Sequence, residues 1–359
     1  MIHKKNHVID RRSFILGSGL IALSSLPLIK GLEAKEKNIR VTFGSCISQD
    51  KEQPIWDSVI KEKSDMLIFM GDNVYGDNWK TGKINKLKKS YAKQRNKIPF
   101  KKLKESNEIF AIWDDHDYGK NDGGSEYIYK QESKKIFLDF WEVPKSDIRR
   151  NREGIYFETK KNINNSLVQF IFLDTRYFRS PLKPTDKRDA PYKERFLPDN
   201  NPSKTFLGED QWMWLSKTLN EKADLRIIVS SIQIIAEGHG FEKWGNLPLE
   251  KEKLYNLIDE KNVKNIIFLS GDRHLSGIYK DKTGLGTEIY EITSSSLNLP
   301  AGKLYKKKDI RPEPGPNRIG PLYTMENYGL IEFFGKKNVS IFIKDIDGKK
   351  INKIELSYQ

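Results

Sequence analysis

The chain has 359 residues, of which 37% are hydrophobic and 31% are charged, a balance that excludes disordered, collagen-like and membrane-bundle proteins. Its single cysteine, Cys46, excludes an internal disulfide and any zinc module built from several cysteines. The 63 Lys and Arg outnumber the 49 Asp and Glu, giving a net charge of +14. This excess favours anionic partners such as phosphoesters, although a solvated lysine-rich surface would explain it equally well.

The first 34 residues have the layout of an export signal. Arg11 and Arg12 follow a polar, basic stretch and precede an apolar run over 14–29, as in twin-arginine signals. A retained membrane anchor is the less favoured alternative, because a spanning helix needs roughly twenty apolar residues. The sequence therefore predicts a signal over 1–34 and one domain over 35–359, exported by the twin-arginine machinery to the periplasm or beyond the cell. Cleavage after Ala34 is only weakly indicated.

Beyond the signal, short β-rich apolar runs alternate with helical patterns. Strands are predicted at 39–43, 66–70, 109–113, 167–173, 225–232, 265–269, 287–293, 329–334, 339–344 and 353–358. Helices are predicted at 56–63, 84–95, 132–141, 210–219 and 249–259. The last three strands, two of them joined by an Asp347-Gly348 turn, add an antiparallel part. We therefore expect an α/β fold, a mixed β-sandwich flanked by helices.

Four of the predicted strands end in loops with ionisable or metal-binding side chains, and the carboxyl ends of strands are where open α/β sheets bind ligands. The loops are Gly44-Ser45-Cys46, Gly71–Tyr75, Asp114–Asp117 and Ser270–His274. Taken singly, each admits an ordinary reading, such as a turn aspartate or a buried cysteine. Together, thiolate, phenolate, carboxylate and imidazole groups favour a metal site. The set suits a trivalent or borderline ion beside an oxygen-preferring divalent one.

Four segments of the chain resemble the landmarks of PhoD-type alkaline phosphatases and phosphodiesterases. That family belongs to the calcineurin-like metallophosphoesterases and is itself exported by the twin-arginine route. The segments are Gly71-Asp72-x-x-Tyr75, Trp113–Asp117, Leu173–Arg179 and Leu269–His274. The resemblance runs from about residue 39 to at least 296, and it departs from longer members in lacking their separate N-terminal β-domain. It implies a calcineurin-like sandwich with its active site at the carboxyl ends of strands.

The resemblance also implies two metal ions and the residues that bind them. A Fe3+ ion would be held by Cys46, Asp72, Tyr75 and His274, with Asp72 bridging to a second ion. Oxygen ligands for that second ion would come from Asp115 and Asp272, and two carboxylates there favour Ca2+ over Zn2+. A hydroxide held by the metals would attack the phosphorus.

Two further residues are candidates for catalysis. His116 is predicted to protonate or hydrogen-bond the leaving oxygen, with orientation of Asp115 as the alternative. Arg273 lies between two predicted ligands, where a bidentate contact to phosphate and simple charge balance are both open.

Weaker expectations concern residues outside these segments or at their edges. Arg176 and Arg179 are expected to form an ion pair with Asp174 rather than to reach the phosphate. An additional metal ligand could come from the amide of Gln233. His239 is expected in a surface loop, with a place at the substrate entrance as the less favoured alternative, and a place for Asn298 at the rim of the site is not favoured.

The stretch from Lys80 to Lys104 contains eleven Lys and Arg and no acid. Ile84, Leu87 and Tyr91 recur at helical spacing, which predicts an amphipathic helix with a solvated basic face. The alternative is a surface that attracts a polyanionic substrate or acidic lipid. Without a series of aromatic residues, specific nucleic-acid recognition is not expected.

The leading prediction is an exported metal-dependent phosphoesterase acting on phosphomonoesters or phosphodiesters. The alternative is an exported protein on the same scaffold that binds phosphate-bearing ligands without turnover. All six predicted ligands are present, and this favours the enzyme, because a non-catalytic binder has no need of the thiolate and the phenolate.

Overall fold

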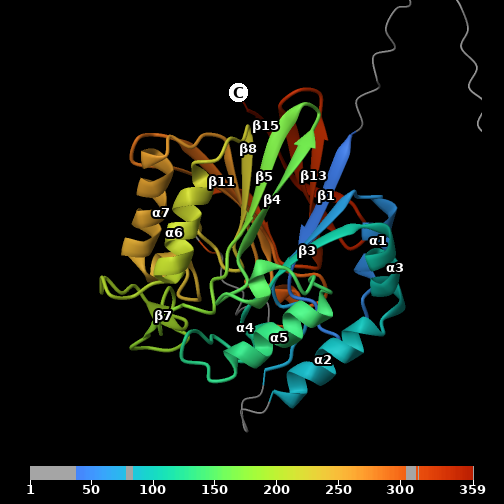
Figure 1. Cartoon of the computed structure of the whole chain (residues 1–359), viewed down its shortest axis with the longest axis horizontal. Helices are drawn as coiled ribbons and strands as arrows, with labels where there is room; N and C mark the ends of the chain where they lie inside the picture. Colours follow the sequence, from blue (N-terminus) through green and yellow to red (C-terminus); the bar gives the residue numbers. More distant parts are fainter. Residues whose placement is uncertain (1–37, 78–83, 305–312, 314, 359) are drawn as a thin grey trace, which may run out of the picture. The chain divides into compact units, whose positions relative to one another are not determined.

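The computed structural model describes residues 38–77, 84–304, 313 and 315–358, all of which belong to one structural unit. The predicted signal over 1–34 lies outside the described residues, so its division from the rest of the chain stays a prediction. Within the described part, no helix combines the length and the apolar character needed to cross a membrane. Two mixed β-sheets pack face to face with helices outside them, as expected for the α/β class (Figure 1).

The first sheet joins the N-terminal strands to the C-terminal ones. Its order is β15 (Lys350–Ser357), β14 (Asn338–Asp345), β13 (Asn327–Phe334), β1 (Ile39–Gly44), β2 (Met66–Met70) and β3 (Glu108–Ile112). Neighbours among β1, β2 and β3 are parallel, whereas β13, β14 and β15 pair antiparallel. The Asp347-Gly348 turn lies between β14 and β15 as predicted, and Gly348 has a φ of 82°.

The second sheet has a parallel centre and antiparallel edges. Its order is β12 (Arg318–Tyr323), β10 (Ser276–Lys282), β11 (Glu288–Ser294), β9 (Ile266–Ser270), β8 (Leu225–Val229), β5 (Ser166–Phe172) and β4 (Phe157–Ile163). The sequence analysis did not predict β4, β10 or β12. All three carry charged or turn-forming residues within the strand, which hides the apolar pattern of a strand.

Side chains of the second sheet alternate between two hydrophobic layers. On β8, Ile227 and Val229 join the core between the sheets, whereas Ile228 joins the layer beneath the helices. That outer layer contains Leu215 of α6 (Gly208–Leu219) and Leu254 of α7 (Pro248–Glu260), which cover this sheet in Figure 1. Because each buried aliphatic side chain contributes about 1.5–3 kcal/mol, this alternation fixes the register of the strand.

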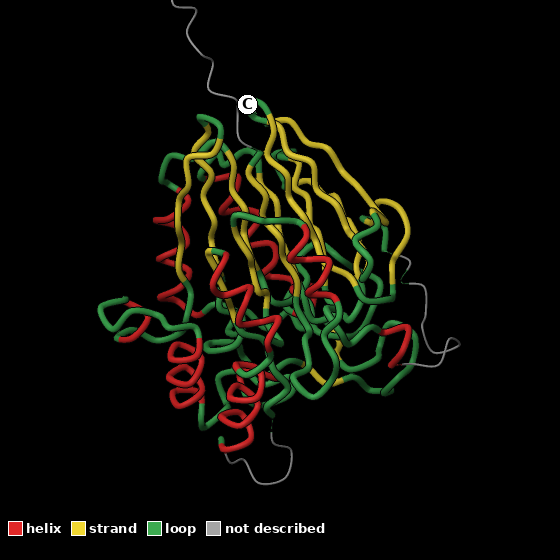
Figure 2. Tube along the Cα trace, turned by 90° about the vertical axis from the view of Figure 1, so that its right-hand side faces the viewer, coloured by secondary structure: helices red, strands yellow, loops and turns green. Residues whose placement is uncertain are grey.

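Most of the remaining helices lie beside the first sheet or at the ends of its strands, whereas one 3-10 turn packs against α7 beside the second sheet. They are α1 (Ile55–Lys61), α2 (Asn85–Arg95), α3 (Ile98–Ser106), α4 (Asp115–Tyr118) and α5 (Lys130–Phe140), with the single-turn α8 (Ala301–Leu304) and the 3-10 turns η1 (Ile148–Arg150) and η2 (Trp244–Asn246). Figure 2 shows most loops and several helices gathered at one end of the strands. A minor two-stranded sheet, β6 (Lys183–Pro184) with β7 (Phe196–Leu197), lies within one long connection.

The basic stretch forms two helices rather than the single helix that its spacing predicts. Lys97 is extended between α2 and α3, and Pro99 lies in the first turn of α3. Proline has no backbone N–H to bond the preceding turn, so it breaks a helix interior but is tolerated in a first turn, and the helix restarts here. Residues 80–83 of the stretch lie outside the described part.

Gly71 lies at the end of β2, where the chain passes close to the end of β3. Its φ is +104°, and a Cβ atom added to it would lie 2.4 Å from the Cβ of Asp114. Gly286, in the connection between β10 and β11, has a similar φ of +84° but no atom within 4 Å of such a Cβ. The two glycines therefore separate the cost of the backbone conformation from the cost of close packing.

We predict that Gly71→Ala lowers the free energy of unfolding by more than about 2 kcal/mol, because it adds a steric clash to left-handed backbone strain. Gly286→Ala should cost only about 1 kcal/mol, the cost of the left-handed conformation alone. Urea denaturation of both variants checks the difference. Equal losses in the two variants would show that the ends of β2 and β3 are not packed as described.

Candidate metal centre

The four loops singled out in the sequence meet at the carboxyl ends of β1, β2, β3 and β9. Positive φ angles occur at 59° for Cys46, 50° for Asp72, 69° for Asp272 and 55° for His274. Residues with a Cβ atom rarely adopt this left-handed conformation, and it concentrates at functional sites. The backbone at these four candidate ligands is therefore strained.

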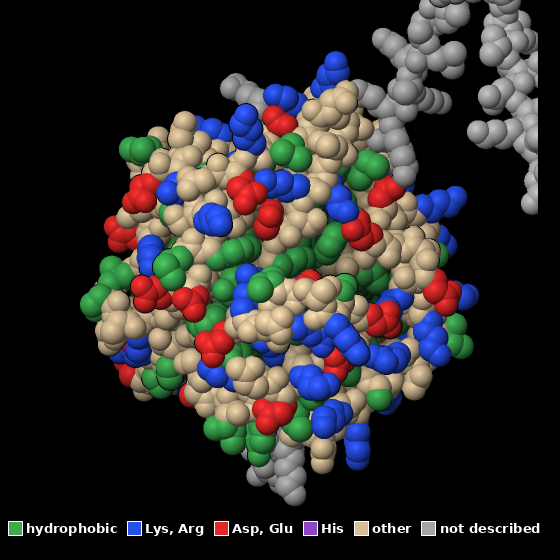
Figure 3. All heavy atoms as spheres, in the orientation of Figure 1, with side chains coloured by type: hydrophobic (Ala, Val, Ile, Leu, Met, Phe, Trp, Pro, Cys, Tyr) green, Lys and Arg blue, Asp and Glu red, His purple; other side chains and the backbone are tan. Residues whose placement is uncertain are grey.

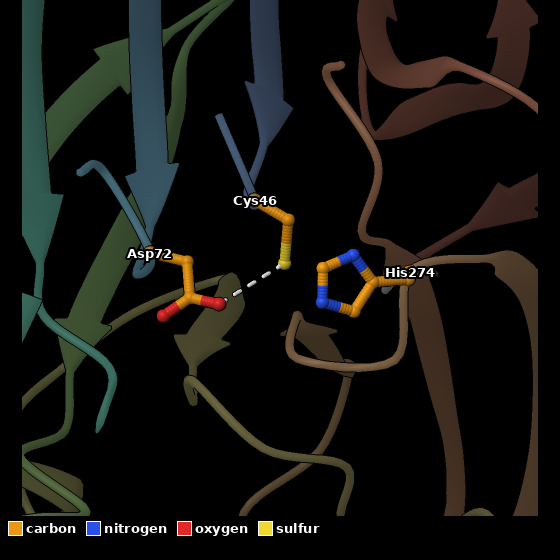
Figure 4. A group of neighbouring side chains, drawn as sticks. All are labelled: Cys46, Asp72 and His274. Carbon is orange, nitrogen blue, oxygen red and sulfur yellow. Dashed lines mark hydrogen bonds between the residues drawn. The ribbon is translucent and has the colours of Figure 1, made fainter. Parts of the chain in front are cut away.

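Cys46, Asp72 and His274 point toward one another from three separate loops (Figure 4). One ligand atom of each lies within 4.8 Å of the others. The Cys46 thiol lies 3.5 Å from Asp72 Oδ2, and the Tyr75 hydroxyl donates to the same oxygen at 3.0 Å. The structure thus brings together the four residues predicted to hold the first ion.

Residues that the sequence analysis missed orient two of these side chains. His274 donates Nδ1–H to the carbonyl of Leu299, which leaves Nε2 as the atom that can bind a metal. Ser295 Oγ lies 3.2 Å from Cys46 Sγ and accepts the backbone N–H of His274 at 2.9 Å. Ser295 and Leu299 follow β11, far along the chain from Cys46, and no local pattern marks them.

A second group of carboxylates adjoins the first. Ligand atoms of Asp114, Asp115 and Asp272 lie within 4.8 Å of one another, and Asp72 forms a similar group with Asp115 and His116. Asp72 therefore adjoins both groups, the position expected of a bridging ligand. Asp115 Oδ1 and Asp114 Oδ2 are buried and find no hydrogen-bond donor among the described residues. Asp114 was not predicted as a ligand.

The buried acidic groups of the cluster are electrostatically unfavourable without a bound cation. Burial, with the nearby carboxylate of Asp72, raises the pKa of Cys46 and of Tyr75 well above their ordinary values. Burial also raises the pKa of Asp72 and of Asp272. Neighbouring carboxylates raise both pKa values further, because a second negative charge close by is unfavourable. Cations between these donors would remove the repulsion, so the donor set and its unpartnered oxygens fit bound metal ions.

His116 adjoins this cluster from the start of α4. Its Nδ1 lies 2.7 Å from Asp77 Oδ1, and its ring centroid lies 4.3 Å from that of Tyr75. Burial alone would lower the pKa of His116, but the carboxylates of Asp115, Asp72 and Asp77 outweigh it and raise the pKa. With Nδ1 engaged, Nε2 is the ring atom left for a ligand.

A cavity of about 570 Å³ opens onto the cluster. Its lining includes Asp115, His116, Asp272, Arg273 and His274 from the predicted loops. The remaining wall comes mainly from two connections, 189–195 and 238–242, that carry no motif.

His239 lines this cavity and is only 4% exposed, so the favoured expectation of a surface loop is wrong, and the geometry agrees with the alternative place at the cavity. Its Nε2 bonds the amide oxygen of Gln233 at 3.0 Å, while its Nδ1 accepts the N–H of Phe241. The amide oxygen of Gln233, which the sequence suggested as a further metal ligand, is therefore hydrogen-bonded to His239. Local sequence could not show this, because the glycines that flank His239 are typical of exposed turns.

Arg273 also lines the cavity, but its guanidinium forms an ion pair with Glu313. The guanidinium carbon lies 4.3 Å from the centre of the Phe241 ring. Glu313, forty residues further along the chain, was not considered in the sequence analysis. The structure thus gives Arg273 a carboxylate partner outside the metal-binding loops.

The expected ion pair between Asp174 and the two arginines after β5 is not formed. Arg176, fully buried, bonds Asp114 through Nε at 2.6 Å and pairs with Glu242 at 2.6 Å. Arg179 lies 3.3 Å from the same Glu242. Asp174 is instead occupied by backbone N–H groups and by the Trp113 indole, which satisfy its oxygens without a cation.

Asn298 has a structural role away from the cavity. Its side chain accepts the N–H of Ser48 at 2.7 Å and donates to the carbonyls of Ser48 and Glu52. These bonds fix the loop that follows Cys46. Asn298 does not line the cavity, as the sequence analysis expected.

Comparison with known proteins gives matches to one group of enzymes. A family model described as PhoD-like phosphatase matches residues 42–328. Alkaline phosphatase D of Bacillus subtilis (strain 168) is 24% identical over 292 residues, which are 71% of this chain and 49% of that protein. The chain thus spans about half the length of this curated relative.

Solved structures agree in fold. A structure of PhoD superposes with a TM-score of 0.67 at 16% identity, covering 89% of this chain and 68% of the other. A purple acid phosphatase from yellow lupin (Lupinus luteus) seeds gives a TM-score of 0.53 at 14% identity, covering 90% and 54%. At these identities the likeness is one of fold.

Proposed function

The chain belongs to the PhoD-like phosphatase family, and we propose that it is an exported metal-dependent phosphoesterase that hydrolyses phosphomonoesters or phosphodiesters. The proposal rests on the convergence of Cys46, Asp72 and His274, whose ligand atoms lie within 4.8 Å of one another. A ligand atom of Asp72 also lies within this distance of Asp115, which belongs to the second carboxylate group. The cavity over these groups supplies the space that a substrate requires.

We propose Fe3+ and Ca2+ as the ions. Thiolate, phenolate and imidazole donors from Cys46, Tyr75 and His274, with Asp72, suit iron, and carboxylates of Asp115 and Asp272 suit calcium. When bound, such a pair neutralises phosphoryl oxygens and acidifies a water molecule at neutral pH. A tyrosinate on iron should also give the protein colour.

Within this proposal, His116 acts as the proton donor to the leaving group. Asp77 holds the ring through Nδ1, and the ring lies tilted against that of Tyr75 at the cavity wall. A proton held on Nε2 is then available to the leaving oxygen as its bond to phosphorus breaks.

Removal of single ligands tests the metal assignment. Purified protein should contain about one iron per chain, and Asp72→Asn or His274→Ala should lose iron and at least about 100-fold in kcat/KM on nitrophenyl phosphate. Asp50→Asn is the matched control, because this carboxylate lies in the loop after Cys46 but is exposed and paired with Lys93. Elemental analysis and turnover are measured on folded protein.

Normal iron content and turnover in Asp72→Asn would overturn the assignment. A colourless protein that binds phosphate without turnover would support the alternative of a non-catalytic binder.

The leaving group distinguishes the two roles considered for His116. His116→Ala should lower kcat about 10²- to 10⁴-fold on alkyl or phenyl phosphate, whose leaving oxygens need a proton. On nitrophenyl phosphate the loss should be far smaller, because nitrophenolate leaves without one. An equal loss on all substrates, with normal metal content, would instead assign His116 to the orientation of Asp115.

We also propose that residues 1–34 direct export through the twin-arginine machinery, which the layout around Arg11 and Arg12 supports. Replacing both arginines with lysine should retain the protein in the cytoplasm, as measured by cell fractionation. Unchanged export of this variant would contradict the proposal.

We propose finally that the basic surface on α2 and α3 attracts anionic substrate or acidic lipid. Lys and Arg side chains gather over this part of the molecule in Figure 3. Exposed Lys88, Lys89, Lys101 and Lys102 carry much of this charge. Attraction of this kind weakens as salt rises.

A further inference from the structure

The arginines around the cavity differ in whether a carboxylate neutralises them. Arg176 pairs with Asp114 and Glu242, Arg179 approaches Glu242, and Arg273 pairs with Glu313. Arg195 also lines the cavity, yet none of the described residues hydrogen-bonds or ion-pairs with its side chain. Its Nε is buried without a partner.

The backbone of Arg195 is held firmly in the cavity wall. Its N–H donates to the carbonyl of Gly240 at 2.9 Å, and its own carbonyl accepts the N–H of Thr185 at 2.9 Å. At Gly240 a Cβ atom would lie 2.5 Å from the nitrogen of Glu194, so this close contact requires glycine. The hydrogen bond between Arg195 and Gly240 thereby links the connections 189–195 and 238–242.

The guanidinium shares its cavity with the candidate metal ligands Asp115, Asp272 and His274. Its positive charge also acts on the carboxylate of Asp122 in the same cavity, although the two side chains form no ion pair. A half-buried guanidinium with an unpartnered N–H is costly unless an anion supplies the missing hydrogen bonds. The cavity that contains the candidate metal ligands therefore also contains an anion-binding group.

We propose that Arg195 binds a non-bridging oxygen of the substrate's phosphoryl group. This inference rests on the proposed phosphoesterase function and adds a substrate-binding residue to it. The planar guanidinium can donate two parallel hydrogen bonds to a phosphate, a geometry that a lysine cannot reproduce. Arg273, for which the sequence left a phosphate contact open, is already paired with Glu313, so Arg195 is the arginine available for this contact.

Inorganic phosphate is the probe that tests this contact. Arg195→Gln should weaken phosphate binding about 10- to 100-fold, both as a competitive inhibitor and in calorimetry, and should lower kcat/KM by a similar factor. Arg195→Lys should recover only part of the loss. Iron content and circular dichroism should match the wild type, because Arg195 contacts no metal ligand in the structure.

Lys193→Gln is the matched control, since it removes a cation from the same connection but one that is exposed and paired with Asp186. It should change phosphate affinity less than about twofold. The inference is overturned if Lys193→Gln and Arg195→Gln lose phosphate affinity equally and both losses vanish at high salt. That result would show a general electrostatic attraction of phosphate rather than a direct contact with Arg195.

The outcomes separate this inference from the function beneath it. Normal wild-type turnover together with normal phosphate binding by Arg195→Gln would overturn the contact alone. A metal-loaded wild type that neither hydrolyses esters nor binds phosphate would overturn both.

Discussion

Negative charge crowded at the ends of parallel strands is the constraint that organises this molecule. Cys46, Asp72 and Asp115 are buried and Asp272 is partly buried, and Asp72 adjoins both groups of ligands. Such groups cannot all ionise in so small a volume without cations. The charge is concentrated there because three parallel strands of one sheet and one of the other end at the same edge, and each ends in a loop that turns inward.

Hydrogen bonds and ion pairs link the loops that carry these groups. Asp117 accepts the backbone N–H groups of Asp72 at 3.2 Å and of Asp114 at 2.6 Å, which ties the loop after β2 to the loop after β3. Arg176 then links Asp114 to Glu242 in the connection after β8. A buried ion pair of this kind adds little stability by itself, but losing one partner would leave an uncompensated charge at the cavity. We therefore regard Arg176 as a residue that positions the cavity wall.

Much of the cavity wall is formed by the connections 189–195 and 238–242 rather than by strands. Arg195 and His239 lie on segments without regular structure for most of their length, and Glu313 reaches the site from a distant part of the chain. Under the proposed function, such residues would contact the substrate, whereas the strand-end loops would hold the metal ions. Members of one family can thus share metal ligands and differ in substrate.

The sequence by itself determined the class of fold and the candidate ligands, because both are written locally. Apolar runs such as 66–70 mark strands, and the residues just after them, Asp72 among them, must lie at a strand end. It also indicated the family, confirmed by the match over 42–328. The tertiary structure alone decided the partners of each charge, because these depend on segments that meet only after folding. Arg176 pairs with Asp114 instead of Asp174, and Arg273 pairs with Glu313. Arg195 forms no ion pair with a carboxylate among the described residues. The residues in these pairs are separated along the chain by distances that give no periodic signal.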